Sequence, residues 1–295
     1  MMLAGARLHL GRITDANAQF AEIIAAHDPD QLLRLQESQG SNYAALARAW
    51  QAHALWCLGY PQQALNRGLD AVKLVQDLDQ PFNQALVSAY LALLQQLRAG
   101  ETVAREHAEH AHELTSKYQA PYYHTWADIL VRYALALEQP DEERIEHLRE
   151  SISEFKASGA RLRLPYYLSL LAQVCGKAGN PEEGLVTIDE ALSEVRTHNE
   201  RCWDAELHRL RGEFLLMEGA DASDVEAALL RAIEIARAQQ ARSLELRATM
   251  SLARLWIAQN RSDDAKRQLS DMCAWFTEGF ETPDLQAARL LLAHL

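Results

Sequence analysis

The densest group of possible metal ligands lies between Glu106 and His112, where the sequence reads EHAEHAH. His107 and His110 are three residues apart, so on a helix they share one face, as two ligands of one metal ion would. The segment lacks the HExxH pattern of zinc hydrolases. The adjacent carboxylates Glu142–Glu143 and Glu182–Glu183 are candidates for acid–base chemistry, which pairs two such groups in one site. The elements that carry these residues decide whether they do chemistry.

Other catalytic motifs are absent from the sequence. It contains no GxSxG and no recognisable Ser/His/Asp or Cys/His motif. It also lacks a GxxxxGK[ST] phosphate loop, since Gly176-Lys177 is followed by Ala178 and position 171 is leucine. We therefore expect no catalytic residue, no metal site and no cofactor.

Composition narrows the class of partner. The net charge of −12 disfavours a nucleic-acid surface, which needs clustered Lys and Arg. The four cysteines form no CxxC pair, which favours a reducing cytoplasm over a disulfide framework or zinc site. No apolar run is long enough to span a membrane, and Met1–Leu10 is too short and mixed for a signal peptide. We expect a cytoplasmic protein that contacts neither nucleic acid nor membrane.

Small residues recur with a period of about forty residues. One series falls 40, 40, 40 and 41 residues apart at Ala71, Ala111, Ser151, Ala191 and Ala232. A second series has the same period, at Ala52, Ala92, Ala172, Gly212 and Ala253, with Arg132 in the vacant position. Two series with one period predict two packed helices per repeat, because small side chains let helix backbones approach closely. The chain is therefore predicted to be all-α, an α-solenoid of antiparallel helix pairs.

Turn signals between the two series set the limits of the pairs. Gly or Asn ends the first helix, and Pro or an acidic residue begins the second, as in Gly179-Asn180-Pro181-Glu182-Glu183. The predicted pairs are 43–78, 82–118, 122–157, 163–197, 203–239 and 243–277. We expect three regions: a truncated repeat with an irregular linker (1–42), six pairs (43–280) and a C-terminal capping helix (281–295).

The repeat changes the interpretation of the candidate chemistry. Position 110 aligns with Asp70, Glu150, Glu190 and Arg231, which together describe a charged, solvated face. The acidic pairs fall where second helices begin, and negative charge stabilises a helix N-terminus. Both groups are interpreted as structural.

Several segments resemble a known family. The helix pairs look like tetratricopeptide repeats with a longer unit. More narrowly, four segments resemble the C-terminal region of large bacterial predicted ATPases that follow a nucleotide-cyclase or winged-helix regulator domain: 176–185, 205–216, 243–256 and 275–285. The resemblance implies a regulatory or scaffold segment of such a protein, without its catalytic domains.

In tetratricopeptide-like repeats the first helix of each pair lines a concave groove. Positions six and three before the small residue of the second series, and one after it, share a helix face. Candidate groove residues on this face are His53, Trp126, Tyr133, Tyr166, Gln173, Glu206, Arg209, Glu213, Arg247 and Arg254. Aromatic rings beside arginine suit a peptide with a carboxylate or a stacked sugar. The alternative is that the rings pack between repeats, while charges such as Arg209 and Glu213 pair with each other.

We expect a non-catalytic interaction scaffold whose groove binds a peptide or partner domain, such as an ATPase or cyclase domain of the same parent protein. The alternative is a sensor that binds a small effector at the aromatic middle of the groove. An enzyme is the least favoured reading, since it would need a deep pocket with strongly perturbed titratable groups.

Overall fold

A computed structural model of the chain describes residues 1–26 and 42–295. The predicted linker from His27 to Gly40 lies outside the described residues. Every regular element within the described ranges is a helix. The helices are α1 (Met2–His9), α2 (Ile13–Ala25), α4 (Tyr43–Cys57), α5 (Pro61–Asp77), α6 (Pro81–Arg98), α7 (Glu101–Lys117), α8 (Pro121–Glu138), α9 (Glu142–Ala157), α10 (Leu164–Lys177), α11 (Pro181–His198), α12 (Asp204–Met217), α13 (Ala222–Ala238), α14 (Arg242–Ala258), α15 (Ser262–Trp275) and α16 (Pro283–Ala293).

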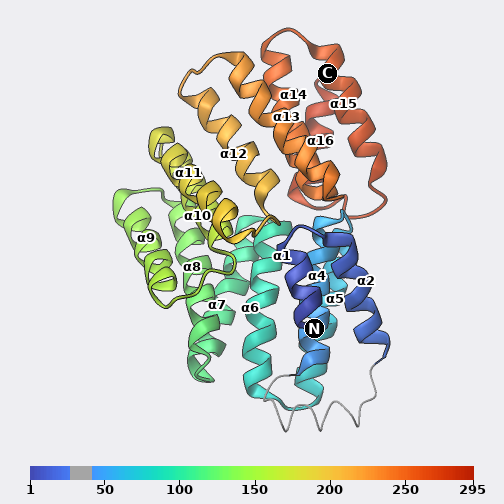
Figure 1. The fold of residues 1–295 in the computed structure, drawn as a ribbon, viewed down its shortest axis with the longest axis vertical. Coiled ribbons are helices and arrows are strands. Elements are labelled where there is room, and N and C mark those ends of the chain that lie inside the picture. Colours follow the sequence, from blue (N-terminus) through green and yellow to red (C-terminus); the bar gives the residue numbers. More distant parts are fainter. Residues whose placement is uncertain (27–41) are drawn as a thin grey trace.

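Consecutive helices form antiparallel pairs, and the pairs stack side by side along the chain (Figure 1). The first helix of one pair also packs against the first helix of the next, as α4 does on α6, α6 on α8 and α12 on α14. The helix bounds lie within two residues of those expected from the turn signals. The predicted all-α solenoid of about forty residues per repeat is confirmed.

The small residues lie where helices cross. All members of the first series and all small members of the second are buried. At Gly212 of α12, a Cβ atom would lie 2.8 Å from the side chain of Leu229 on α13. The exception, Arg132, is half-buried and pairs with Asp128 one turn earlier at 2.8 Å. The period thus records close contacts between helices.

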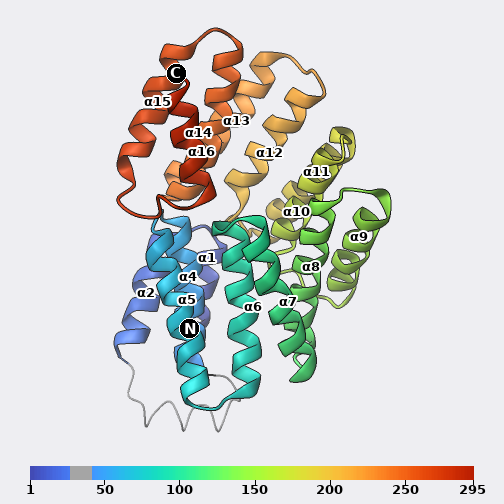
Figure 2. The same ribbon diagram turned by 180° about the vertical axis from the view of Figure 1, so that it is seen from behind.

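The solenoid curls until its two ends meet, so that α14 contacts α4 and the lower ends of α14 and α16 lie near the upper ends of α4 and α5 (Figures 1 and 2). Ser243 at the start of α14 donates a hydrogen bond of 2.5 Å to the carbonyl of Trp56 in α4. The Glu278 carboxylate accepts hydrogen bonds of 3.0 Å from the backbone N–H groups of Gln62 and Gln63, and so caps the N-terminus of α5. These contacts close the inner face of the solenoid into a ring.

The interior beside the N-terminal helices is filled by an aromatic cluster around Arg163. This residue ends the loop before α10 with a left-handed backbone (φ 71°). Its guanidinium lies 4.8 Å from the ring centre of Trp126, 5.3 Å from that of Tyr90 and 5.8 Å from that of Trp50. Glu200 accepts the backbone N–H of Arg163 and contacts His9 of α1 at 3.0 Å. This half of the inner face is therefore packed solid.

Candidate functional site

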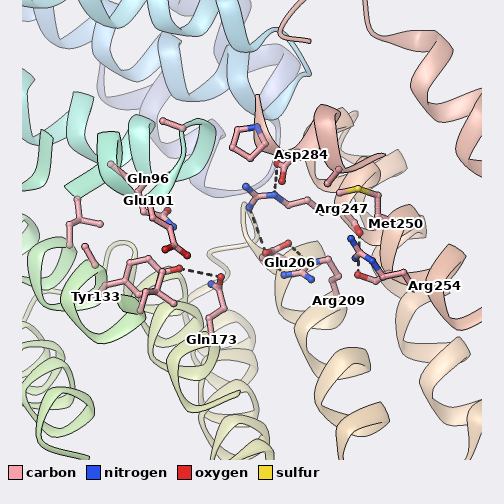
Figure 3. A pocket seen from close by; sticks show the side chains of 18 residues that line it. Gln96, Glu101, Tyr133, Gln173, Glu206, Arg209, Arg247, Met250, Arg254 and Asp284 are labelled. Atoms are coloured by element: carbon pink, nitrogen blue, oxygen red, sulfur yellow. Dashed lines mark hydrogen bonds and ion pairs between the residues drawn. The ribbon is translucent and has the colours of Figure 1, made fainter. Parts of the chain in front are cut away.

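The remaining half of the inner face forms a partly open cavity of about 380 Å³, which we call the central pocket. Five first helices converge on it, namely α6, α8, α10, α12 and α14, and the N-terminal turns of α7 and α16 complete the wall (Figure 3). Its volume lies within the range of small-ligand sites, roughly 300–1,000 Å³. Curling of the solenoid thus produces a concave, partly open site.

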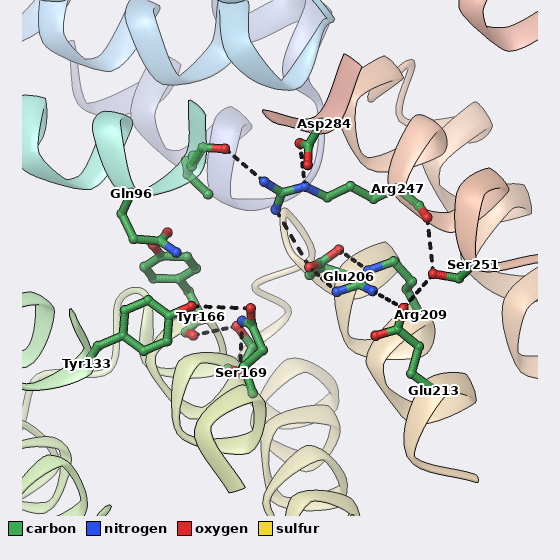
Figure 4. A network of polar contacts seen from close by, with 12 residues as sticks. Gln96, Tyr133, Tyr166, Ser169, Glu206, Arg209, Glu213, Arg247, Ser251 and Asp284 are labelled. Atoms are coloured by element: carbon green, nitrogen blue, oxygen red, sulfur yellow. Dashed lines mark hydrogen bonds and ion pairs between the residues drawn. The ribbon is translucent and has the colours of Figure 1, made fainter. Parts of the chain in front are cut away.

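One wall of the central pocket carries neutral polar groups beside the carboxylate of Glu101. Tyr133 donates from its hydroxyl to the side-chain oxygen of Gln173 at 3.3 Å, and Tyr166 donates to Gln96 (Figure 4). Gln173 also donates to the carbonyl of Ser169 at 3.1 Å. Burial raises the pKa of Tyr133 above its usual value, so its hydroxyl keeps its proton. This wall offers amide and hydroxyl groups to a ligand.

The opposite wall is a network of ion pairs on α12. Arg209 contacts Glu206 through two hydrogen bonds, 2.8 and 2.7 Å long, and Glu213 at 2.6 Å (Figure 4). Burial alone would raise the pKa of Glu206, but the guanidinium groups of Arg209 and Arg247 lower it. Burial would likewise lower the pKa of Arg209, but the two glutamates raise it. Both partners therefore stay charged inside the protein.

Arg247 of α14 connects this network to the ends of the solenoid. It donates to Asp284 of α16 and to the carbonyl of Leu97 in α6, each at 2.8 Å, and lies 3.7 Å from Glu206. Its guanidinium also lies 5.0 Å from the ring centre of Trp56 in α4. One side chain therefore fixes four helices around the pocket.

Eight of the ten predicted groove residues gather at this site. Six line the central pocket: Tyr133, Gln173, Glu206, Arg209, Arg247 and Arg254. Tyr166 and Glu213 lie directly behind them, through the hydrogen bond of Tyr166 to Gln96 and that of Ser251 to Glu213 at 2.7 Å. These residues lie together at one site, and their role in binding is taken up under the proposed function.

The other two predicted residues do not line the pocket. His53 is 3% exposed and donates from Nε2 to the carbonyl of Tyr90 at 2.9 Å, and its burial lowers its pKa to about 3. Trp126 is 1% exposed and packs against Tyr90, Tyr123 and Arg163. Trp126 therefore belongs to the packed cluster around Arg163, whereas Tyr133 of the predicted aromatic middle lines the pocket.

Sequence reasoning missed the pocket residues Gln96, Glu101, Ser251 and Asp284. Glu101 and Asp284 lie in the first turns of α7 and α16, which are not first helices of the repeat. Curvature brings those turns to the pocket. The sequence signal for these two residues was an acidic side chain at a helix start, but that signal is also what ordinary stabilisation of a helix N-terminus produces.

The histidine segment lies on α7, away from the pocket. His107 is half-buried and lies 3.2 Å from the side chain of Gln95, whereas His110 is exposed. Within the described ranges, no group of three His, Cys, Asp or Glu residues is arranged to hold a metal ion. None of the helices in the same ranges is both long and apolar enough to cross a bilayer.

No protein-family model matches the chain. An uncharacterized protein of Rhizobium meliloti (strain 1021) is 34% identical over 113 residues, which are 38% of this chain and 11% of that protein. The chain thus matches only a small part of that relative's length.

Solved structures are similar in fold at low sequence identity. NprR in complex with its cognate peptide NprX is 13% identical, with a TM-score of 0.63 over 93% of this chain and 82% of that one. A Rap protein complexed with Competence and Sporulation Factor is also 13% identical, with a TM-score of 0.57 over 99% and 94%. The yeast Tom70 structure is 16% identical, with a TM-score of 0.50 over 95% and 58%. The chain therefore has the tetratricopeptide-like fold that its repeats predicted.

Proposed function

We propose that this chain is a non-catalytic binding module whose central pocket takes a short peptide or an exposed segment of a partner protein. The observation that carries the proposal is the convergence of five first helices on one partly open cavity. A scaffold without such a site would fill its inner face with side chains, as this chain does around Arg163.

The lining of the central pocket suits a peptide. Apolar surface comes from Leu130, Leu137 and Met250, and carboxamides come from Gln96 and Gln173. A carboxamide both donates and accepts hydrogen bonds, so it can pair with a peptide group, while the apolar surface takes side chains. The proteins of similar fold include NprR, solved with its cognate peptide NprX, and a Rap protein, solved with Competence and Sporulation Factor.

The charged groups of the pocket support binding over catalysis. Glu206 is held ionised by Arg209 and Arg247, and its lowered pKa makes it a poor proton acceptor near neutral pH. Both arginines have raised pKa values, because carboxylates outweigh the effect of burial, so neither can give up a proton. These charged carboxylate and guanidinium groups are suited to bind a ligand through ion pairs.

Binding of a small effector is the second candidate, and the cavity volume of about 380 Å³ favours it. In this version the effector would lie against Tyr133 of the aromatic middle and against Met250, since Trp126 is buried in the core. Either ligand would connect α6 and α8 to α14 and so stabilise the closed ring. Regulation of an attached signalling domain, such as an ATPase or cyclase in a cytoplasmic parent protein, would follow from that change.

Filling the pocket tests the proposal. Ala134→Trp places an indole in the cavity, while Ala222→Trp puts the same ring on an exposed part of α13 and serves as the control. A random hexapeptide library is panned on the wild-type protein, and enriched peptides are titrated by fluorescence anisotropy. We expect A134W to lose binding and A222W to keep it, with the same circular dichroism spectrum for both.

Two outcomes would contradict peptide binding in this pocket. One is the absence of any enriched peptide on protein shown to be folded. The other is equal affinity of the two tryptophan variants. A thermal shift produced by a metabolite library, with no peptide enriched, would favour the small-effector candidate instead.

A further inference from the structure

The arginines of the central pocket differ in what they can offer a ligand. Arg209 is occupied by Glu206 and Glu213, and Arg247 by Asp284 and the carbonyl of Leu97. Arg254 lines the same cavity, is exposed, and has no ion pair or hydrogen bond with the residues that the structure describes. An incoming anion would therefore meet, on the α14 side, one guanidinium group that no carboxylate in the described ranges contacts.

The opposite end of the pocket is acidic. Glu101 lines it, and its ion-pair partner is Lys177 at 3.5 Å, with both side chains well exposed. Glu101 and Ala134 also line an adjoining cleft of about 490 Å³ between α7 and α8. That cleft holds three more glutamates, at positions 106, 109 and 138, against the single cation Arg105.

The cleft keeps a negative charge after its internal pairing. Arg105 bonds to Glu109 at 2.8 Å and to Glu138 at 2.7 Å, so one positive charge is shared by two carboxylates. Glu106 adds a further negative charge, and so does Glu101, whose charge the exposed Lys177 offsets in part. Cavities lined by one sign of charge attract ligands of the opposite sign. A cationic group would therefore be stabilised at this end and an anionic group at Arg254.

We propose that the pocket selects a ligand with charges of opposite sign at its two ends and fixes its direction. This inference rests on the proposed function and specifies its ligand: a short peptide with a carboxylate at Arg254 and an ammonium or guanidinium group at Glu101 and the cleft. Figure 3 shows Glu101 beside Gln96 on one side of the cavity and Arg254 beside Met250 on the other. The neutral groups of Tyr133 and Gln173 lie along the wall that carries Glu101.

Neutralising one charge at a time tests the direction. Peptides enriched on the wild-type protein are resynthesised with a free or amidated C-terminus, with a free or acetylated N-terminus, and with each charged side chain replaced by alanine. They are titrated against Arg254→Gln and Glu101→Gln. The matched controls are Arg267→Gln, which removes an arginine that is 73% exposed on α15, and Glu234→Gln, which removes a glutamate that is 69% exposed on α13.

We expect each pocket variant to weaken the parent peptide about tenfold, and each control to leave its affinity unchanged. R254Q should cause no further loss once the carboxylate is neutralised, and E101Q none once the cation is neutralised. These pairings also identify which terminus or side chain carries each charge. Added salt should reduce the affinity of the wild type more than that of either variant.

The inference is overturned if enriched peptides keep their affinity when either end is neutralised, or if R254Q and E101Q behave like their controls. Peptide binding itself would stand in that case. If no peptide is enriched on folded protein, the proposed function fails, and the direction of the ligand fails with it.

Discussion

Replacing Arg247 by methionine should destabilise the protein strongly. Methionine keeps an apolar stem against Trp56 but removes the two hydrogen bonds of 2.8 Å, to Asp284 and to the Leu97 carbonyl. Glu206 keeps Arg209 as a partner, so no buried carboxylate is left without a cation. A hydrogen bond to a charged group contributes about 1.5–3 kcal/mol. Asp284 is partly exposed, which places its bond at the lower end of that range.

The expected loss in the free energy of unfolding is therefore about 3 kcal/mol. It is measured by urea unfolding followed by far-UV circular dichroism and extrapolated to water. The control is Arg267→Met, which removes a highly exposed arginine of α15 and should change stability by no more than about 0.5 kcal/mol. Equal stability of R247M and R267M would refute the view that Arg247 holds four helices together.

Three further predictions concern packing, acid stability and closure. Ala191→Leu inserts a large side chain at a buried helix crossing and should lower the free energy of unfolding by about 1–3 kcal/mol. The same unfolding assay should detect little change in the control Ala222→Leu. Equal losses in the two variants would refute the assignment of Ala191 to a helix crossing. The pKa of His53 is lowered to about 3 in the folded protein, so below about pH 6.5 the unfolded chain binds a proton that the folded protein does not. The neutral ring should therefore contribute fully to the stability of the protein above about pH 6.5, and this contribution should decrease as the pH falls toward about 3. H53L should therefore flatten this part of a stability–pH profile, and an unchanged slope would argue against a neutral buried ring. Glu278→Gln weakens the cap of α5 and should cost about 1 kcal/mol, with Glu234→Gln as control; equal melting temperatures of the two variants would count against the cap.

Much of the fold could be predicted because each repeat obeys the same local rules. Small residues at helix crossings, such as Ala191 and Gly212, and prolines at helix starts, such as Pro181, occur at one period. Neighbouring repeats make most of the contacts, so local sequence carries most of the information. The first-helix register also found pocket residues such as Tyr133 and Arg209, because they share the face that turns inward.

The sequence pattern could not predict the curvature. A small rotation between repeats adds up along the chain and decides which distant segments meet. Glu101 and Asp284 reach the pocket in this way. Trp126 has the right register but is buried in the core, because Arg163 of the next repeat packs over its ring. Nothing in a single repeat encodes these contacts.

Closure of the ring changes how the chain should come apart. An open array of repeats contacts only its neighbours and can unravel from either end, one unit at a time. In this protein, residues separated by 191, 187 and 216 positions are hydrogen-bonded, in the pairs His9–Glu200, Trp56–Ser243 and Gln62–Glu278. Unfolding of the C-terminal helices would therefore remove contacts that stabilise the N-terminal helices. The molecule should therefore melt in one cooperative step and fold more slowly than an open array of equal length, because its closing contacts join distant parts of the chain.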